Sequence, residues 1–466
     1  MKNILEFIID LRDRGVFIQE FNEQLKITGN VASLSEEDKN TIRELKPALL
    51  NFLKEKGRGR KQHFSRIEPV AAAKDYSLSS SQRRLWVLSQ YDQGNAAYNI
   101  SGAYVFEGRL DTDVFRQSFD MLIARHEILR TVFREDEEGR VRQFILTPEQ
   151  TGFDISFKDL RLQDEQVGQL VADIAGQPFD LAAGPLVRAG LYEVADSKWI
   201  FAYAMHHIIS DAWSMDVLIR ELLQVYNAGT KGEADPLQPL RIQYKDYAAW
   251  QQEQLSGDTL HQHQEYWLKQ FDGELPVLEL IPDRQRPAVK TYNGASVRRK
   301  IDMQLTRSLK TLTQELGGTL FMGLLAAVKA LIYRYTGQED VVIGSPIAGR
   351  DHVDLEGQIG FYINTLALRT RFKGENSYKE LLEEVKQTTL NAYEYQLYPF
   401  DELVEKLSLR RDTSRSPLFD VMVILQNAGS ENAKAQQLDK LRITGYEGLK
   451  QVVSQFDITF EFGEAE

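Results

Sequence analysis

The run Ala204-Met-His-His-Ile-Ile-Ser-Asp-Ala-Trp-Ser214 marks the place where a β pattern gives way to a helix pattern. Residues 199–207 are apolar and aromatic, which predicts a buried strand. Ser214 is then expected to cap a helix that continues to Val225. The buried face of this helix is predicted to contain Val217, Leu218, Leu222 and Val225. Because the end of a strand holds the following residues rigidly, this junction can present a reactive side chain.

Two histidines and an aspartate stand at this junction. His206 and His207 are adjacent, and Asp211 follows four residues after His207. Side chains alternate along a strand, so if the strand persists to its end, the two imidazoles point to opposite faces. A neutral imidazole can accept a proton from an attacking nucleophile near pH 7, and a nearby aspartate can fix the loop or the ring. The pattern therefore fits proton transfer by one of the histidines.

Two other interpretations of the pair are open. One is a histidine buried in the core beside the acidic start of a helix. The other is a metal site, which needs a third ligand. The chain has seven histidines and no cysteine, and four of the histidines stand in contexts without ligand spacing, namely His126, His261, His263 and His352. We therefore predict no metal at this junction.

Six more short motifs accompany the histidine run, in a fixed order from about residue 76 to the end of the chain. In chain order, the seven are Ser79, Gln82, Arg84, Leu85, Trp86 and Leu88; Arg125-His126-Glu127 with Leu129-Arg130-Thr131 and Phe133; the histidine run; Tyr244, Asp246-Tyr247-Ala248 and Trp250; Ile359-Gly360 with Asn364-Thr365 and Arg369; Pro399-Phe400; and Arg411-Asp412, Ser414-Arg415 and Pro417-Leu418-Phe419. Together they resemble the condensation domains of nonribosomal peptide synthetases, whose signature is His-His-x-x-x-Asp-Gly. Here Ala212 replaces the glycine of that signature, and its methyl group narrows the space beside the reacting centre.

The resemblance implies an α/β fold with two lobes of the chloramphenicol-acetyltransferase type, at residues 76–250 and 251–466. It places a tunnel between the lobes, with the histidine loop at its middle. Members of the family usually continue for some tens of residues beyond this end, so we expect the second lobe to be incomplete and an adenylation domain to follow in the native chain. Periodicity by itself predicts helices at 110–125, 321–335, 377–397 and 400–407, and strands at 128–133, 141–145, 341–344 and 418–426.

The resemblance also implies a reaction, namely amide-bond formation between a donor thioester and an acceptor aminoacyl thioester. Both substrates would be carried on phosphopantetheine arms of partner carrier proteins, and the domain itself would bind no cofactor covalently. Of the catalytic pair His207 and His206, His207 would position the acceptor amine or take its proton. Asp211 is expected to form a structural ion pair with Arg350. The expected tunnel-wall residues are Ala212, Trp213 and Asn364, although packing roles for Trp213 and Asn364 are equally compatible with the pattern.

Residues 1–56 predict a small αββαα unit. A helical stripe at Ile4, Leu5, Ile8 and Leu11 precedes two short strands, and Ser35 with Asp38 resembles a capping box. The order of these elements and their position at the N-terminus resemble the N-terminal docking domains of synthetase subunits, which bind a C-terminal segment of an upstream subunit. The alternative is a generic helical cap. The expected docking edge contains Phe17, Ile18, Gln19, Glu20, Leu25, Lys26 and Ile27. Residues 57–75 are basic, then small and polar, and predict a linker.

Composition excludes several classes of protein. The 466 residues carry a net charge of −12 with acids and bases mixed along the chain, which argues against a nucleic-acid-binding surface. The absence of cysteine excludes disulfides, and no run of about 20 apolar residues predicts a membrane span. We therefore expect a cytoplasmic protein without membrane partners.

Three other functions compete with condensation. An epimerization domain shares the fold but usually carries serine before tryptophan after the aspartate, whereas this chain has Trp213-Ser214. A soluble acyl-CoA acyltransferase is the second, and the docking-like N-terminus makes carrier-bound substrates the better expectation. The third is a noncatalytic docking or scaffold fragment, against which the intact His-His-x-x-x-Asp argues. A turnover assay with two loaded carriers separates enzyme from scaffold.

Overall fold

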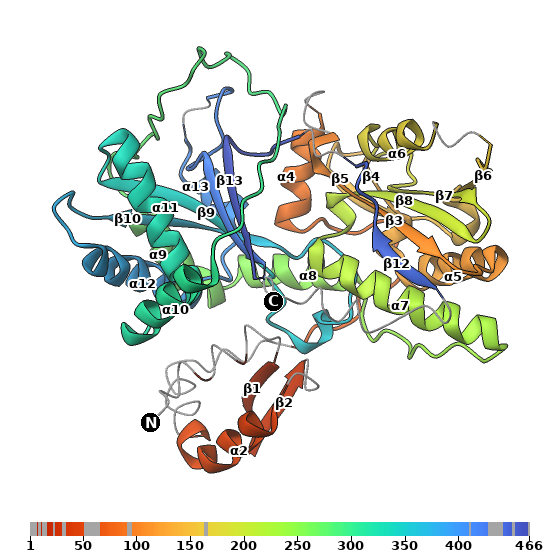
Figure 1. Cartoon of the computed structure of the whole chain (residues 1–466), viewed down its shortest axis with the longest axis horizontal. Coiled ribbons are helices and arrows are strands. Elements are labelled where there is room, and N and C mark those ends of the chain that lie inside the picture. The colour runs from red at the N-terminus through yellow and green to blue at the C-terminus, as the bar shows by residue number, and fades with distance from the viewer. Residues whose placement is uncertain are drawn as a thin grey trace.

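The computed structural model describes residues 7, 11, 16–21, 24–29, 34–50, 66–90, 96–162, 166–409, 412–426, 441–449 and 453–464. Figure 1 shows two sheets side by side, each accompanied by its own helices, and a small hairpin unit apart from both. Each sheet has an apolar core of its own. The predicted α/β class is therefore confirmed.

The first sheet contains five strands in the order β12-β3-β8-β7-β6. Their bounds, in that order, are Arg442–Gly445, Asn99–Glu107, Lys198–His206, Val187–Ala195 and Ile155–Asp159. Neighbouring strands are antiparallel except β6 and β7. Because side chains alternate along β8, Phe201 packs with α5 (Thr112–Arg125) and α7 (Ala212–Lys231), whereas Ala202 packs with α6 (Val167–Gly176).

The second sheet contains four strands in the order β10-β9-β11-β13. Their bounds are Asn364–Arg371, Asp340–Ile347, Val421–Gln426 and Ile458–Gly463. β9 and β10 are antiparallel, whereas β11 is parallel to β9 and to β13. The helices of this half are α9 (His261–Gln270), α10 (Met303–Glu315), α11 (Leu320–Thr336), α12 (Tyr378–Glu394) and α13 (Phe400–Lys406). Leu325 of α11 and Leu382 of α12 are fully buried in the core of this half.

The remaining elements connect and flank the two sheets. They are α4 (Ser80–Ser89), α8 (Tyr244–Ser256), the paired strands β4 (Thr131–Glu135) and β5 (Val141–Ile145), and the 3-10 turns Ala96–Tyr98, Glu127–Arg130, Pro148–Gln150, His207–Ile209, Asp258–Leu260 and Val353–Leu355. Two strand predictions were too long. Ile128 lies in a 3-10 turn because the Leu129 N–H bonds back to the carbonyl of His126. β11 begins three residues after Leu418, whose positive φ of 66° interrupts the extended backbone.

The hairpin unit at the N-terminus matches the predicted strands. β1 (Val16–Phe21) pairs antiparallel with β2 (Gln24–Gly29), and α2 (Glu36–Glu44) begins with the predicted capping box of Ser35 and Asp38. Residues 46–50 are also helical. The unit has a separate apolar core of Phe7, Leu11, Val16, Ile18, Leu34, Ile42 and Leu49. Ile4, Leu5 and Ile8 of the predicted first helix lie outside the described residues, as do the loop 22–23, residues 51–65 and Arg411.

One segment departs from the predicted division at residues 250 and 251. β12 lies in sequence between β11 and β13 of the second sheet, but it pairs with β3 at the edge of the first sheet, and Leu441 and Ile443 join the first core. The two halves are therefore interleaved at this edge, and the proposed boundary does not apply to β12. Among the described residues no single helix is long and apolar enough to cross a membrane; α10 and α11 pass that test only as a pair, across a bend of 105°.

Candidate active site

The histidine run folds as a strand, a turn and a helix. β8 ends at His206, the 3-10 turn covers His207–Ile209, and α7 begins at Ala212. The helix cap is Asp211 rather than Ser214, because Oδ1 of Asp211 accepts the backbone N–H of Ser214 at 2.8 Å. The helix also continues beyond Val225, to Lys231. The prediction therefore misplaced both ends of the helix, although its predicted inner face is buried.

His206 is a buried part of the core. Its side chain is 1% exposed, and Nδ1 accepts the N–H of Ile208 at 3.1 Å, which stabilises the turn. The proton of the neutral ring is therefore on Nε2, which is buried and has no hydrogen-bond partner among the described residues. Burial, with a smaller contribution from His207, lowers the pKa of His206 to about 3. His206 thus stays neutral near pH 7 and shapes the turn.

The lowered pKa of His206 predicts a loss of stability in acid. Above pH 6.5 this histidine is neutral in both states, but below it the unfolded chain takes up a proton that the folded chain excludes down to about pH 3. The unfolding free energy should therefore decrease as the pH is lowered through this window, by at most about 1.4 kcal/mol per pH unit from this group.

Asparagine keeps an acceptor for Ile208 but does not titrate, so His206→Asn should lose less stability than wild type between pH 7 and pH 4. Urea unfolding at several pH values measures this difference. A wild-type-to-variant difference that does not change with pH would contradict it.

His207 differs from its neighbour in exposure and in hydrogen bonding. It begins the 3-10 turn, so strand alternation does not set its direction, and it is only partly buried. Nδ1 lies 2.8 Å from the carbonyl oxygen of Ser210, so Nδ1–H donates and the neutral ring carries its lone pair on Nε2. Burial lowers the pKa of His207 below its usual range, although the charge of Asp211 acts in the opposite direction. A neutral ring with a basic Nε2 follows.

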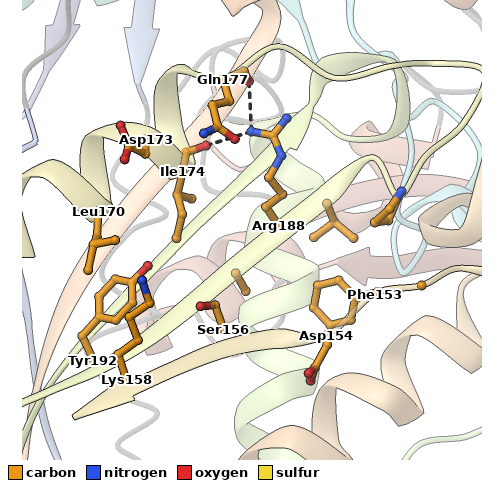
Figure 2. Close-up of a pocket in the computed structure, with 14 residues that line it drawn as sticks. Phe153, Asp154, Ser156, Lys158, Leu170, Asp173, Ile174, Gln177, Arg188 and Tyr192 are labelled. Atoms are coloured by element: carbon orange, nitrogen blue, oxygen red, sulfur yellow. Dashed lines mark hydrogen bonds between the residues drawn. The ribbon is translucent and has the colours of Figure 1, made fainter. Parts of the chain in front are cut away.

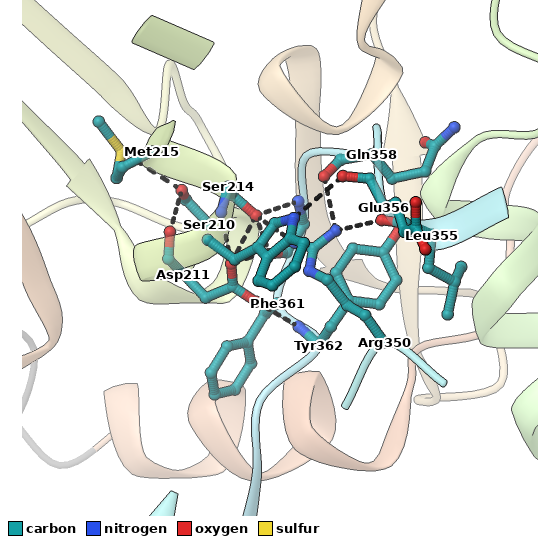
Figure 3. Close-up of polar contacts among 12 residues, drawn as sticks. Ser210, Asp211, Ser214, Met215, Arg350, Leu355, Glu356, Gln358, Phe361 and Tyr362 are labelled. Atoms are coloured by element: carbon teal, nitrogen blue, oxygen red, sulfur yellow. Dashed lines mark hydrogen bonds and ion pairs between the residues drawn. The ribbon is translucent and has the colours of Figure 1, made fainter. Parts of the chain in front are cut away.

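Asp211 and Arg350 are in contact, as the sequence predicts. Nη2 of Arg350 lies 3.1 Å from Oδ1 of Asp211, and both side chains are almost fully buried. Arg350 also donates to the carbonyls of Leu355 and Gln358, and its guanidinium lies 4.1 Å from the ring centroid of Tyr362. Figure 3 shows Arg350 between the start of α7, where Nη2 donates to Asp211 and Ser214, and the carbonyls of Leu355 and Gln358. The pair therefore ties the loop after β9 to the histidine loop.

Ser214 and the segment 360–362 belong to the same cluster, which the sequence did not predict (Figure 3). Oγ of Ser214 lies within hydrogen-bond distance of Asp211, Arg350 and both backbone polar atoms of Gly360. Oδ2 of Asp211 accepts the N–H of Tyr362 at 3.0 Å. The fifth motif was a signal for this segment, but it gave no indication that Asp211 accepts a hydrogen bond from a backbone N–H of the segment.

The first motif supports the histidine loop from α4. Nε2 of Gln82 donates to the carbonyl of Ile208 at 3.2 Å, and Oε1 of Gln82 accepts the N–H of Ser79. Oγ of Ser79 lies 2.9 Å from the hydroxyl of Tyr244 on α8. Three motifs far apart in sequence thus meet at one loop.

The three predicted tunnel-wall residues have different surroundings. Ala212 is exposed at the first position of α7, and Nε1 of Trp213 donates to the carbonyl of Glu356 at 3.0 Å. The amide of Asn364 donates to the carbonyls of Gln396 and Tyr398 and accepts from Phe400. These contacts favour structural roles for Trp213 and Asn364, and their place in a tunnel wall stays a prediction.

A cavity of about 390 Å³ lies away from this cluster, between α6, the edge strand β6 and its neighbour β7. Figure 2 shows Arg188 above it, with its guanidinium turned to the end of α6. There Arg188 donates to the carbonyls of Gln177 and Pro178, so it caps the helix and is not free for a ligand. The described residues also contain no group of three or more His, Asp or Glu side chains that could hold a metal ion.

Comparison with known proteins relates the chain to one family. The condensation-domain model matches residues 72–466. One of the linear gramicidin synthase subunits from Brevibacillus parabrevis is 42% identical over 413 residues, which are 87% of this chain and 8% of that protein. One of the plipastatin synthase subunits from Bacillus subtilis (strain 168) is 41% identical over 396 residues, 85% of this chain and 15% of that protein. The solved X-domain from teicoplanin biosynthesis superposes with a TM-score of 0.78 at 26% identity, covering 86% of this chain and 88% of that one. The chain thus spans a small part of these synthetase proteins.

Proposed function

The chain belongs to the condensation-domain family of nonribosomal peptide synthetases, and we propose that it joins two carrier-bound substrates through an amide bond. Its fold is the two-lobed, chloramphenicol-acetyltransferase-like fold of that family. In this proposal the donor acyl or peptidyl group and the acceptor aminoacyl group are both thioesters on phosphopantetheine arms of partner carrier proteins. The acceptor amine attacks the donor carbonyl, the C–N bond forms, and the donor thiol leaves with a proton.

The state of His207 is the observation that carries this proposal. Its Nδ1–H is held by the carbonyl of Ser210, so Nε2 is the atom that can accept a hydrogen bond or a proton from the amine. The lowered pKa keeps the ring neutral near pH 7, which a base requires. Thioesters are already activated, and holding two substrates together can supply ~7–11 kcal/mol of the barrier. His207 therefore needs only to orient the amine and to remove its proton.

The other residues of the cluster are given supporting roles. Asp211 and Arg350 would hold the histidine loop, and their contacts are to protein groups. His206 would shape the turn from inside the core. Ala212, Trp213 and Asn364 would lie along the path of the substrates between the lobes. The lobes are proposed at residues 76–250 and 251–466, except for β12.

A loaded-carrier assay tests this function. A donor carrier and an acceptor carrier, each bearing an amino acid on its phosphopantetheine arm, are mixed with the chain, and the acceptor arm is analysed by mass spectrometry. We expect a dipeptidyl arm that depends on both carriers and on the chain. Product from acyl-CoA and a free amine, without product from loaded carriers, would instead support an acyl-CoA acyltransferase. No product from either pair of substrates would support the noncatalytic scaffold.

Residues 1–56 are proposed as a docking domain for an upstream synthetase subunit. Within the described residues β1 and β2 pair only with each other, so each strand has an outer edge without a strand partner. An incoming C-terminal segment could add a strand there. The proposed edge residues are Phe17, Ile18, Gln19, Glu20, Leu25, Lys26 and Ile27. Ile18 is buried in the unit's own core, so only its backbone can contact the partner.

Deleting residues 1–56 is expected to abolish transfer from the natural upstream carrier while condensation continues with donor carriers in excess. The separate core of the unit makes this deletion compatible with the rest of the fold. The docking contact is small, so its affinity should be near 1 μM, or about −8 kcal/mol. Transfer rates at low and high donor concentration measure the effect. Unchanged transfer at low concentration after the deletion would refute the docking role.

A further inference from the structure

The ring of Phe361 lies against the imidazole of His207. Their centroids are 4.8 Å apart and their planes meet at 63°, which is an edge-to-face contact. Both side chains are partly exposed, so the contact is at the open side of the histidine loop. In Figure 3 the ring of Phe361 points away from the ion pair of Asp211 and Arg350. Phe361 is therefore an apolar neighbour of the imidazole outside the polar cluster.

The backbone around Phe361 is held from both sides. The preceding residue, Gly360, bonds through its N–H and its carbonyl to Oγ of Ser214. The carbonyl of Phe361 accepts the hydroxyl of Tyr244 at 2.7 Å, and the next N–H, that of Tyr362, donates to Asp211.

A Cβ at position 360 would lie 2.0 Å from the ring of Tyr244, so the two segments are in close contact. The rigid backbone therefore gives the side chain of Phe361 a defined position.

The charged and titratable neighbours of His207 come from several elements. The start of α7 provides Asp211, which is paired with Arg350, and the end of β8 provides His206, which is neutral near pH 7. On α4 the residue that bonds to the histidine loop is Gln82, which donates to the carbonyl of Ile208 and is uncharged. Segment 359–362 provides Phe361, whose ring is uncharged. The arginines of α4, Arg83 and Arg84, pair instead with Glu402 and Asp401 of α13.

We propose that Phe361 is a positioning residue for His207. The phenyl ring of Phe361 fixes the orientation of the imidazole and keeps water away from it. An edge-to-face contact restricts rotation of the imidazole, and an apolar ring beside it disfavours the charged form. The expected effect of Phe361 on the reaction rate rests on the proposed function. The expected effect of Phe361 on the titration of His207 does not depend on that function.

Histidine titration tests the inference without any substrate. With ¹³C-labelled histidine only the seven histidines contribute to the NMR spectrum, and the signal missing in His207→Asn identifies His207. Phe361→Ala should raise the midpoint of His207 by roughly 0.5–1 pH unit, because water reaches the ring. Phe361→Leu, which keeps most of the apolar volume, is the matched control and should leave the midpoint near that of wild type. An unchanged midpoint in Phe361→Ala, or equal shifts in both variants, would overturn the inference.

The loaded-carrier assay gives the second readout. Because a base must be neutral, the acid limb of kcat against pH should move to higher pH in Phe361→Ala by the same amount as the midpoint. Above the limb kcat should be about tenfold lower, from lost orientation, with KM for the acceptor carrier little changed. If Phe361→Ala destabilises the fold, Phe361→Val gives the same shifts at smaller size. An inactive wild type would contradict the proposed function and leave the titration to decide the inference.

Discussion

Replacing His207 by alanine is expected to lower amide-bond formation by about 10²-fold or more. In the proposal only Nε2 of His207 accepts the amine proton, and the variant loses this atom. The other ring nitrogen, Nδ1, is held by the carbonyl of Ser210. The side chain is partly exposed, so its removal should leave the fold intact. The rate of dipeptide formation between two loaded carriers, at saturating concentrations of both, measures the effect.

Two other histidines are the controls for this experiment. His261 is exposed on α9, and His261→Ala should behave as wild type. His206→Ala should act mainly through stability, because His206 is 1% exposed and its Nδ1 is bonded within the turn. Near-wild-type turnover in a folded His207→Ala variant would remove this histidine from the mechanism. A smaller decrease in rate, of about tenfold, would assign most of the catalysis to the positioning of the two thioesters.

Removing either partner of the Asp211–Arg350 pair is expected to destabilise the chain by about 3–5 kcal/mol. The two side chains are 0% and 2% exposed, so the remaining charge would be buried without its counterion. Asp211→Ala also removes the cap of α7 and the acceptor of the Tyr362 N–H. Asp211→Asn keeps a capping oxygen but not the charge, and should therefore lose less. Urea unfolding at pH 7 measures each variant.

A double-mutant cycle separates the pair from its surroundings. Asp211→Ala and Arg350→Ala together should cost clearly less than the sum of the two single changes, because the double variant leaves no unpaired buried charge. Additivity within about 0.5 kcal/mol would mean that the two residues stabilise the chain independently, through their separate backbone contacts.

Side-chain patterns were sufficient to predict the local elements around the site. The apolar run 199–207 and the periodic face of Val217 and Leu222 predicted a buried strand and a helix, because side-chain periodicity directly reflects which face meets the core. The same reasoning predicted the hairpin of β1 and β2 and the capping box of Ser35. The order of seven motifs identified the family, and with it the contact between Asp211 and Arg350.

Apart from the pair of Asp211 and Arg350, the contacts that join these elements into a site came from the three-dimensional packing. Asp211, rather than Ser214, caps α7, and its second oxygen receives the N–H of Tyr362 from the other half of the chain. The ring of Phe361 meets His207, and β12 returns to pair with β3. Every residue carries the same backbone C=O, and every residue except proline the same N–H, so a sequence does not indicate which distant side chain will bind them. Such contacts are set when the two cores bring the segments together.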